Sequence, residues 1–205
     1  MKHLYLAVED QLSELVGSRL LHEAFGRERS FTSLQKNGNG YLRSRLSNFC
    51  EMGVHNVVLL ITDLDRAPCA ATLKQDWFSS RERPAGLLFR VAVREVEAWL
   101  MADRSAFSLF FGFQESVVPE NVEGIADPKE KLLNLAKRAK REVKEELLPR
   151  RGVMAGQGTG YNAKLGEFVS NHWCPQRASS NADSLKRARQ RLREAHELLF
   201  LNKGL

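Results

Sequence analysis

Two aspartates stand two positions apart directly after an unbroken aliphatic run. The run covers residues 57–61, Thr62 follows it, and Asp63 and Asp65 come next. Side chains two apart in an extended chain point the same way, so both carboxylates can face one small volume. Close carboxylates repel each other unless a proton or a cation joins them, and a hard cation such as Mg²⁺ prefers oxygen ligands. The pattern predicts a metal site; the alternative is a loop in which the aspartates cap the next helix.

Three further carboxylates follow other predicted strands. Glu9 comes after an apolar segment at residues 3–8, and Glu95 and Glu97 come after an apolar run at residues 86–93. In parallel α/β proteins, ligands bind beyond the carboxyl ends of the strands. We therefore expect Glu9 and at least one of Glu95 and Glu97 at the same sheet edge as Asp63. The alternative for Glu95 and Glu97 is that the helix dipole favours acidic residues in a first turn.

The elements that would position these residues alternate along the first half of the chain. The spacing of apolar residues predicts helices at 11–25 and 41–52, and a turn is expected at 37–40. Short apolar segments predict strands at 3–8, 30–34 and around the run that begins at Val57. A helix over 68–78, a strand over 86–93 and a helix from Arg94 follow. This strand and helix alternation is typical of a mainly parallel, Rossmann-like α/β sheet.

The second half has a different character, so we expect an α/β core at residues 1–115 and a basic helical extension at 116–205. Asp127 as cap and Pro128 in the first turn predict the start of a helix that runs into a basic stretch. Further helices are expected at 162–173 and 184–200. Four glycines between residues 152 and 160 lack the Gly-Lys-Ser/Thr ending of a P-loop, which favours a plain loop over a phosphate cradle.

Basic residues concentrate in this second half. Nine lie between Lys129 and Arg151 and five between Lys186 and Arg193, in a chain of net charge +6. A nuclease needs carboxylates to hold metal and Lys or Arg to neutralise phosphates. The alternative is that each basic helix is only a solvated face. The candidate nucleic-acid contacts are Arg66, Arg94, Lys137, Arg138, Lys140, Arg141, Arg189 and Arg193.

Composition places the chain among globular proteins without a membrane span. The 205 residues are 43% hydrophobic and 27% charged, and no apolar run approaches the ~20 residues that a span needs. The three cysteines are far apart and form no Cys-x-x-Cys motif. That usage predicts a reducing compartment, so we expect a cytoplasmic protein without a structural zinc site.

Taken together, the acidic residues resemble those of the TOPRIM domain, the catalytic metal-binding domain of topoisomerases, primases and overcoming-lysogenization-defect nucleases. The matching segments are Leu6-Ala7-Val8-Glu9-Asp10 and Asp63-Leu64-Asp65. The segment Glu95-Val96-Glu97-Ala98-Trp99-Leu100, with the later Asp127-Pro128-Lys129, resembles a bacterial TOPRIM-like family of unknown function. The resemblance covers most of the chain. Asp10 stands where TOPRIM proteins commonly have Gly.

The resemblance implies a magnesium- or manganese-dependent nuclease with a TOPRIM-like fold. Glu9, Asp63 and Asp65 would bind the metal, with Glu97 or Glu95 completing the ligand set. Lys129, Arg66 or Arg94 would stabilise the transition state. Many such nucleases work with an ATPase, and because this chain has no Walker motif, the ATPase would be a separate protein.

Two other functions compete with the nuclease. A strand ending in Asp-x-Asp also resembles the nucleophile motif of haloacid dehalogenase-type phosphatases, although Arg66-Ala67-Pro68 follows here and no paired acidic motif comes later. The second is a non-catalytic module that binds nucleic acid or a protein through its basic helices and keeps a vestigial acidic site. Metal-dependent cleavage assays separate the three.

Overall fold

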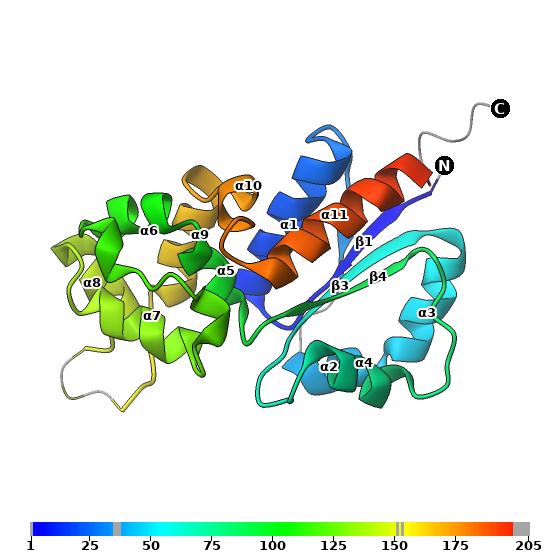
Figure 1. Cartoon of the computed structure of the whole chain (residues 1–205), viewed down its shortest axis with the longest axis horizontal. Helices are drawn as coiled ribbons and strands as arrows, with labels where there is room; N and C mark the ends of the chain where they lie inside the picture. Colours follow the sequence, from blue (N-terminus) through cyan, green and yellow to red (C-terminus); the bar gives the residue numbers. More distant parts are fainter. Residues whose placement is uncertain (1, 35–37, 151, 153, 199–205) are drawn as a thin grey trace.

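A computed structural model describes residues 2–34, 38–150, 152 and 154–198 of the chain (Figure 1). Its centre is a parallel sheet of four strands in the order β2-β1-β3-β4. These strands are β1 (Leu4–Ala7), β2 (Thr32–Ser33), β3 (Val57–Asp63) and β4 (Leu87–Ala92). Helices cover the sheet on both faces, so the fold is α/β and Rossmann-like, as the alternation of apolar segments predicts.

The aliphatic run forms β3, an inner strand that pairs with β1 on one side and β4 on the other. Alternate side chains of a strand point to opposite faces. Val57, Leu59 and Ile61 enter one buried cluster, whereas Val58 and Leu60 enter the other. Both faces of β3 are therefore buried, which explains why its sequence is continuously apolar and does not alternate between apolar and polar residues.

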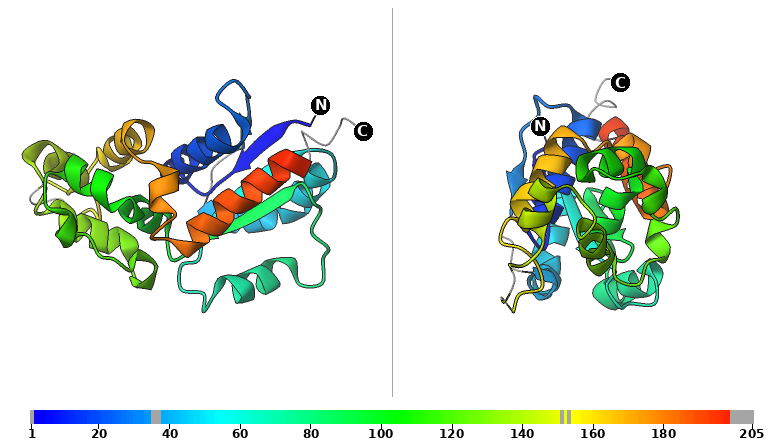
Figure 2. Two further views of the ribbon diagram at one scale, coloured as in Figure 1. Left: turned by 45° about the horizontal axis from the view of Figure 1, so that its top comes forward. Right: turned by 90° about the vertical axis from the view of Figure 1, so that its left-hand side faces the viewer.

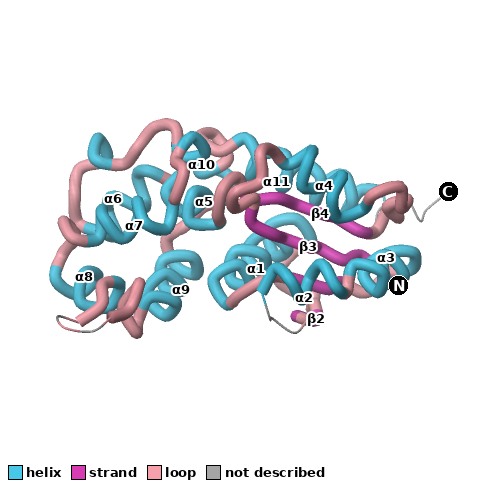
Figure 3. Tube along the Cα trace, turned by 90° about the horizontal axis from the view of Figure 1, so that it is seen from below, coloured by secondary structure: helices cyan, strands magenta, loops and turns pink. Residues whose placement is uncertain are grey.

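Each face of the sheet carries its own helices. Helices α1 (Gln11–Phe25) and α11 (Asp183–His196) contact each other and supply apolar residues to the cluster on one face (Figure 2). Helices α2 (Gly38–Ser44), α3 (Leu46–His55) and α4 (Ala70–Phe78) supply apolar residues to the cluster on the other face (Figure 3). The result is a three-layer arrangement in which β4 is an edge strand.

A group of helices extends the molecule beyond the carboxyl end of β4 (Figure 1). It contains α5 (Val96–Ala102), α6 (Arg104–Phe111), α7 (Pro128–Ala136), α8 (Arg141–Leu147), α9 (Tyr161–Asn171), α10 (Pro175–Ala178) and the 3-10 turns η1 (Glu115–Val117) and η2 (Val122–Gly124). One continuous apolar cluster joins these helices to the α1 face of the sheet. None of the helices in the described residues is long and apolar enough to cross a membrane.

Three predicted elements are wrong in detail. The turn expected at 37–40 is instead the start of α2, which begins at Gly38 with a φ of 75°; Asn37 lies outside the described residues. The helix expected at 41–52 is divided into α2 and α3 because Arg45 leaves helical geometry at φ −96° and ψ 5°. The basic helix after Asp127 is divided into α7 and α8, since the amide of Lys140 donates to the carbonyl of Phe111 at 2.8 Å and holds the connection.

Candidate functional site

Glu9 and Asp63 meet where β1 and β3 end. Glu9 lies two residues beyond β1, and its Oε1 accepts hydrogen bonds from the amide of Asp63 at 3.0 Å and from Oγ1 of Thr62 at 2.5 Å. Nδ2 of Asn39, on α2, lies 3.2 Å from Thr62 Oγ1 and 3.5 Å from Glu9 Oε1. The pairing of β1 with β3 thus fixes the Glu9 carboxylate against the end of β3.

Asp63 also connects the sheet to α5. Its Oδ1 accepts the amide of Val96 at 3.0 Å, which satisfies a free N–H in the first turn of that helix. The alternative that the aspartates cap the next helix does not hold, because Cys69 is the N-cap of α4. Asp63 caps a helix that begins 33 residues later, which sequence spacing does not indicate.

The loop after β3 has a defined shape. Asp65 is exposed and has a φ of 48°, a left-handed conformation that Asp tolerates better than most residues. Arg94 holds this loop, since its Nη1 donates to the carbonyls of Asp65 and Ala67, both at 2.9 Å. Arg94 therefore positions the segment that carries Asp65.

Glu95 and Glu97 lie at the start of α5 and bind residues from the helical group. Oε2 of Glu95 accepts the amide of Lys129, at the start of α7, at 2.8 Å. Glu97 is buried, and its Oε1 accepts the hydroxyl of Tyr161, at the start of α9, at 2.8 Å. The ammonium of Lys129 lies 5.2 Å from the centroid of the Tyr161 ring. The acidic cluster, defined as Glu9, Asp10, Asp63, Asp65, Glu95 and Glu97, thus lies where the sheet meets the helices.

Burial and mutual repulsion raise the pKa values of Asp63 and Glu9. The pKa of Asp63 lies well above its ordinary value, first because of burial and then because Glu97, Glu9, Asp10 and Asp65 surround it with negative charge. Burial also raises the pKa of Glu9, against the hydrogen bonds from Thr62 and the Asp63 amide. Such strongly perturbed carboxylates at a sheet edge are typical of functional sites.

The two glutamates of α5 are shifted in the same direction. Burial raises the pKa of Glu97 to about 7, although the Tyr161 hydroxyl opposes the shift. Burial raises the pKa of Glu95 as well, opposed mainly by the amide of Lys129. Burial and the adjacent Glu97 carboxylate raise the pKa of Tyr161, so this hydroxyl stays a donor at neutral pH.

The chemistry of this donor set suits a hard cation. All six side chains are carboxylates, and a divalent cation would relieve the repulsion that raises the pKa of Asp63. Within the described residues, the side-chain hydrogen bonds of Asp63, Glu95 and Glu97 each use one oxygen, which leaves the other oxygen of each carboxylate for a ligand. In the described part of the chain, no three His, Cys, Asp or Glu side chains are grouped so that they could hold one ion. These side chains are thus of the type that binds a hard cation, but in this structure each carboxylate is bound to a different protein group.

Asp10 has a structural role that explains its presence beside Glu9. Its Oδ1 accepts the amide of Ser13 at 2.8 Å, so it is the N-cap of α1. A cap of this kind is worth about 1 kcal/mol. Asp10 therefore fixes the start of the helix that follows Glu9.

The predicted nucleic-acid contacts are dispersed over the surface. Arg66 is exposed in the loop after β3, Lys137, Arg138 and Lys140 are exposed between α7 and α8, and Arg193 is exposed on α11. Arg141 is exposed as well and pairs with Glu145 at 2.6 Å. Arg189, by contrast, is buried: its Nε lies 3.0 Å from Oε2 of Glu23, and its Nη1 donates to Ser179. The Arg189 guanidinium therefore joins α11 to α1 and is occupied within the fold.

Three residues of the site were not singled out by the sequence. Thr62 and Asn39 bind the Glu9 carboxylate, and Tyr161 binds Glu97. The position of Thr62, directly before the aspartates on a buried strand, was a usable signal. The sequence around Asn39 and Tyr161 gives no such signal, because each residue reaches the site through the packing of a helix that is distant in sequence.

Comparison with known proteins adds no relative. A scan against models of protein families finds no match, and searches of curated proteins and of solved structures find none either. The resemblance to TOPRIM domains therefore stays a hypothesis based on the acidic motifs and their spacing.

Proposed function

We propose that the protein is a nuclease that cleaves phosphodiester bonds with Mg²⁺ or Mn²⁺. The observation that supports this most is the environment of Asp63, a carboxylate whose pKa is raised by burial and by four neighbouring carboxylates. This concentration of negative charge destabilises the site unless protons or cations neutralise it. A divalent cation is the neutralising group that also supplies chemistry on phosphate esters.

In this proposal the ligands are Glu9, Asp63 and Asp65, with Glu97 or Glu95 completing the set. A bound ion would activate a water molecule and stabilise charge on the scissile phosphate. The chain's own contribution is to orient these groups. Thr62 and the Asp63 amide hold Glu9, and the Val96 amide holds Asp63.

Lys129 has the charge needed near the acidic cluster. Its positive charge opposes the rise in the pKa values of Glu95 and Glu97, so its ammonium acts on the same region. A cation placed there can stabilise negative charge that develops on a phosphate. We further propose that the fold is a TOPRIM variant, that the enzyme is cytoplasmic, as its three free cysteines suggest, and that it works with a separate ATPase.

A cleavage assay on single-stranded and duplex DNA and RNA tests this function. The parent protein should cut at least one of these with Mg²⁺ or Mn²⁺, and EDTA should stop the reaction. Asp63→Asn should reduce cleavage by at least a hundredfold, whereas Asp76→Asn, an exposed position paired with Arg43, should leave it unchanged. Hydrolysis of a small phosphate monoester without cleavage of polymers would favour the phosphatase instead. No metal-dependent hydrolysis of either substrate would refute the proposed enzyme.

A further inference from the structure

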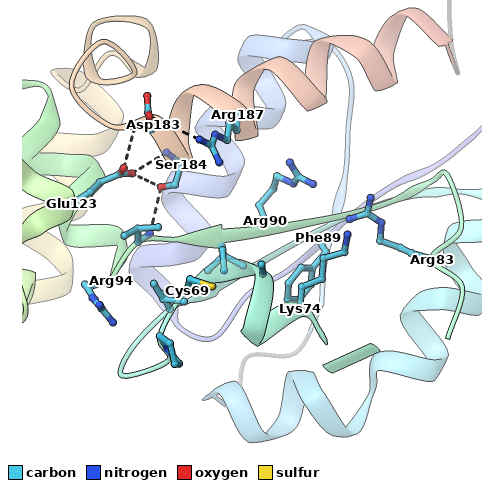
Figure 4. Close-up of a pocket in the computed structure, with 16 residues that line it drawn as sticks. Cys69, Lys74, Arg83, Phe89, Arg90, Arg94, Glu123, Asp183, Ser184 and Arg187 are labelled. Atoms are coloured by element: carbon cyan, nitrogen blue, oxygen red, sulfur yellow. Dashed lines mark hydrogen bonds and ion pairs between the residues drawn. The ribbon is translucent and has the colours of Figure 1, made fainter. Parts of the chain in front are cut away.

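A basic groove runs along the open edge of the sheet, apart from the acidic cluster. Its volume is about 570 Å³, and it lies along β4 between α4 and α11 (Figure 4). Five cationic side chains line it but only two carboxylates do, and the figure shows Arg187 on α11 on one side of the strand and Lys74 on the other. The five are Lys74, Arg83, Arg90, Arg94 and Arg187.

The floor of the groove is the outer edge of β4. The carbonyl of Ala92 accepts the amide of Leu64, beside β3, so alternate residues back along β4 face β3. The backbone groups of Phe89 and Val91 therefore point outward into the groove. Within the described chain no strand pairs with β4 on that side.

The cations of the groove are largely unneutralised. In the described part of the chain, the side chains of Lys74, Arg83 and Arg90 form no hydrogen bond or ion pair, and the Nε of Arg90 is buried without a partner. Arg187 has only a 4.0 Å contact with Asp183, and both of these side chains are exposed. The guanidinium of Arg90 therefore brings to the groove a positive charge that no hydrogen-bond partner in the described residues neutralises.

The two carboxylates that line the groove leave these cations largely unneutralised. Glu123 accepts the amides of Asp183 and Ser184 at 3.1 and 2.9 Å, and so is bound to the start of α11. Asp183 is exposed and makes only the 4.0 Å contact with Arg187. Outside the lining, Glu194 of α11 attracts Arg90 but is itself bonded to Arg191 at 3.0 Å. Burial, Arg83 and Arg191 lower the pKa of Arg90 to about 10, so it remains charged at neutral pH and surrounded by like charge.

We propose that this groove binds the phosphate backbone of a single nucleic-acid strand. The inference rests on the proposed function and extends it by naming where the substrate is held. Planar guanidinium groups suit phosphate oxygens, and a groove of this volume accommodates part of one strand rather than a duplex. The ring of Phe89 is buried against Trp77 and Phe78, so it offers no platform for base stacking. Recognition would therefore be of phosphates and independent of sequence.

The groove is continuous in the chain with the acidic cluster. Leu64 and Arg94 line it, and each is followed directly by a carboxylate of that cluster, Asp65 and Glu95. A strand held along β4 would thus be directed toward the sheet edge where Asp63 lies. This arrangement separates the cations that hold the polymer from the carboxylates that would repel it.

Fluorescence anisotropy with a short labelled single-stranded DNA and the matching RNA tests the groove. EDTA is present throughout, so that binding is measured without cleavage. The double variant Arg83→Met/Arg90→Met removes two charges and keeps the apolar side-chain stems. It should weaken binding by about tenfold at low salt, and the slope of log K against log salt should become shallower by about 1.4, at about 0.7 for each lost phosphate contact.

Arg27→Met is a control for the loss of positive charge away from the groove, because Arg27 is exposed beside the opposite edge of the sheet, after α1. It should bind as the parent does, and thermal unfolding of all variants excludes loss of fold. Unchanged binding by the double variant, or no binding by the parent, would overturn the inference. Tighter binding of an acidic peptide than of the oligonucleotide, lost in the double variant, would assign the groove to a protein partner instead. If the groove binds strands but no metal supports cleavage, the nuclease proposal fails while the groove stands.

Discussion

Replacing Glu97 by Gln should change how stability depends on pH. Glu97 is 6% exposed, and its pKa is raised from 4.5 to about 7, mainly by burial. The folded protein therefore binds a proton at this carboxyl that the unfolded chain has already released. The contribution of Glu97 to stability is fully present below pH 4.5 and is lost as the pH rises through about 7.

The size of the effect follows from the pKa difference. Between 4.5 and about 7, at about 1.4 kcal/mol per pKa unit, the total is about 3 kcal/mol. Between about pH 5 and about pH 8, Glu97→Gln should gain about 2.5 kcal/mol of unfolding free energy relative to the parent. The Gln side chain can still accept the Tyr161 hydroxyl, and any cost of its buried amide N–H groups is the same at both pH values.

Urea denaturation at several pH values, in EDTA, measures this difference. Glu142→Gln is the control, since Glu142 is exposed on α8, and its stability should follow the parent at every pH. Parallel pH curves for Glu97→Gln and the parent would refute the argument, because they would mean that Glu97 titrates as it does in the unfolded chain.

Two further substitutions test the packing of the fold outside the acidic cluster. Gly86→Ala would place a Cβ 2.1 Å from the carbonyl oxygen of Asn56, so we expect chemical denaturation to show a loss of about 3 kcal/mol in unfolding free energy. In the control Gly40→Ala, in α2, the Cβ meets nothing within 4 Å, so this substitution should be neutral or slightly stabilising. Asp103→Ala removes a buried carboxylate that accepts two hydrogen bonds from Arg177, at 2.9 Å each, and should lower the unfolding free energy by about 3 kcal/mol. A loss below about 0.5 kcal/mol would show that this ion pair is not important for stability.

The sequence predicts the sheet well because its strands are locally encoded. A short aliphatic run without polar interruption is typical of a strand that is covered on both faces, and β3 is that strand. The start of α7 is likewise local, since Asp127 accepts the amide of Glu130 at 2.7 Å and Pro128 occupies the first turn. These features depend on neighbours in the chain, so their pattern is visible in it.

The partners of the acidic residues are not locally encoded. Tyr161 lies 64 positions from Glu97, and the two meet only because the helices of the second half pack at the end of the sheet. Arg189 is similar: α11 has the pattern of a basic solvated helix, yet this arginine is buried against Glu23 of α1. Charge counted along a helix does not reveal which cations are neutralised within the fold.

Calorimetric titration of the protein with Mg²⁺ and Mn²⁺ tests most directly whether the acidic cluster is a metal site. We expect the parent to bind at least one of these ions and Asp63→Asn to bind it at least tenfold more weakly, because the substitution removes a central carboxylate. The Asp76→Asn control should retain the parent affinity. Equal affinity in the parent and in Asp63→Asn would contradict the account, since any bound ion would then lie elsewhere.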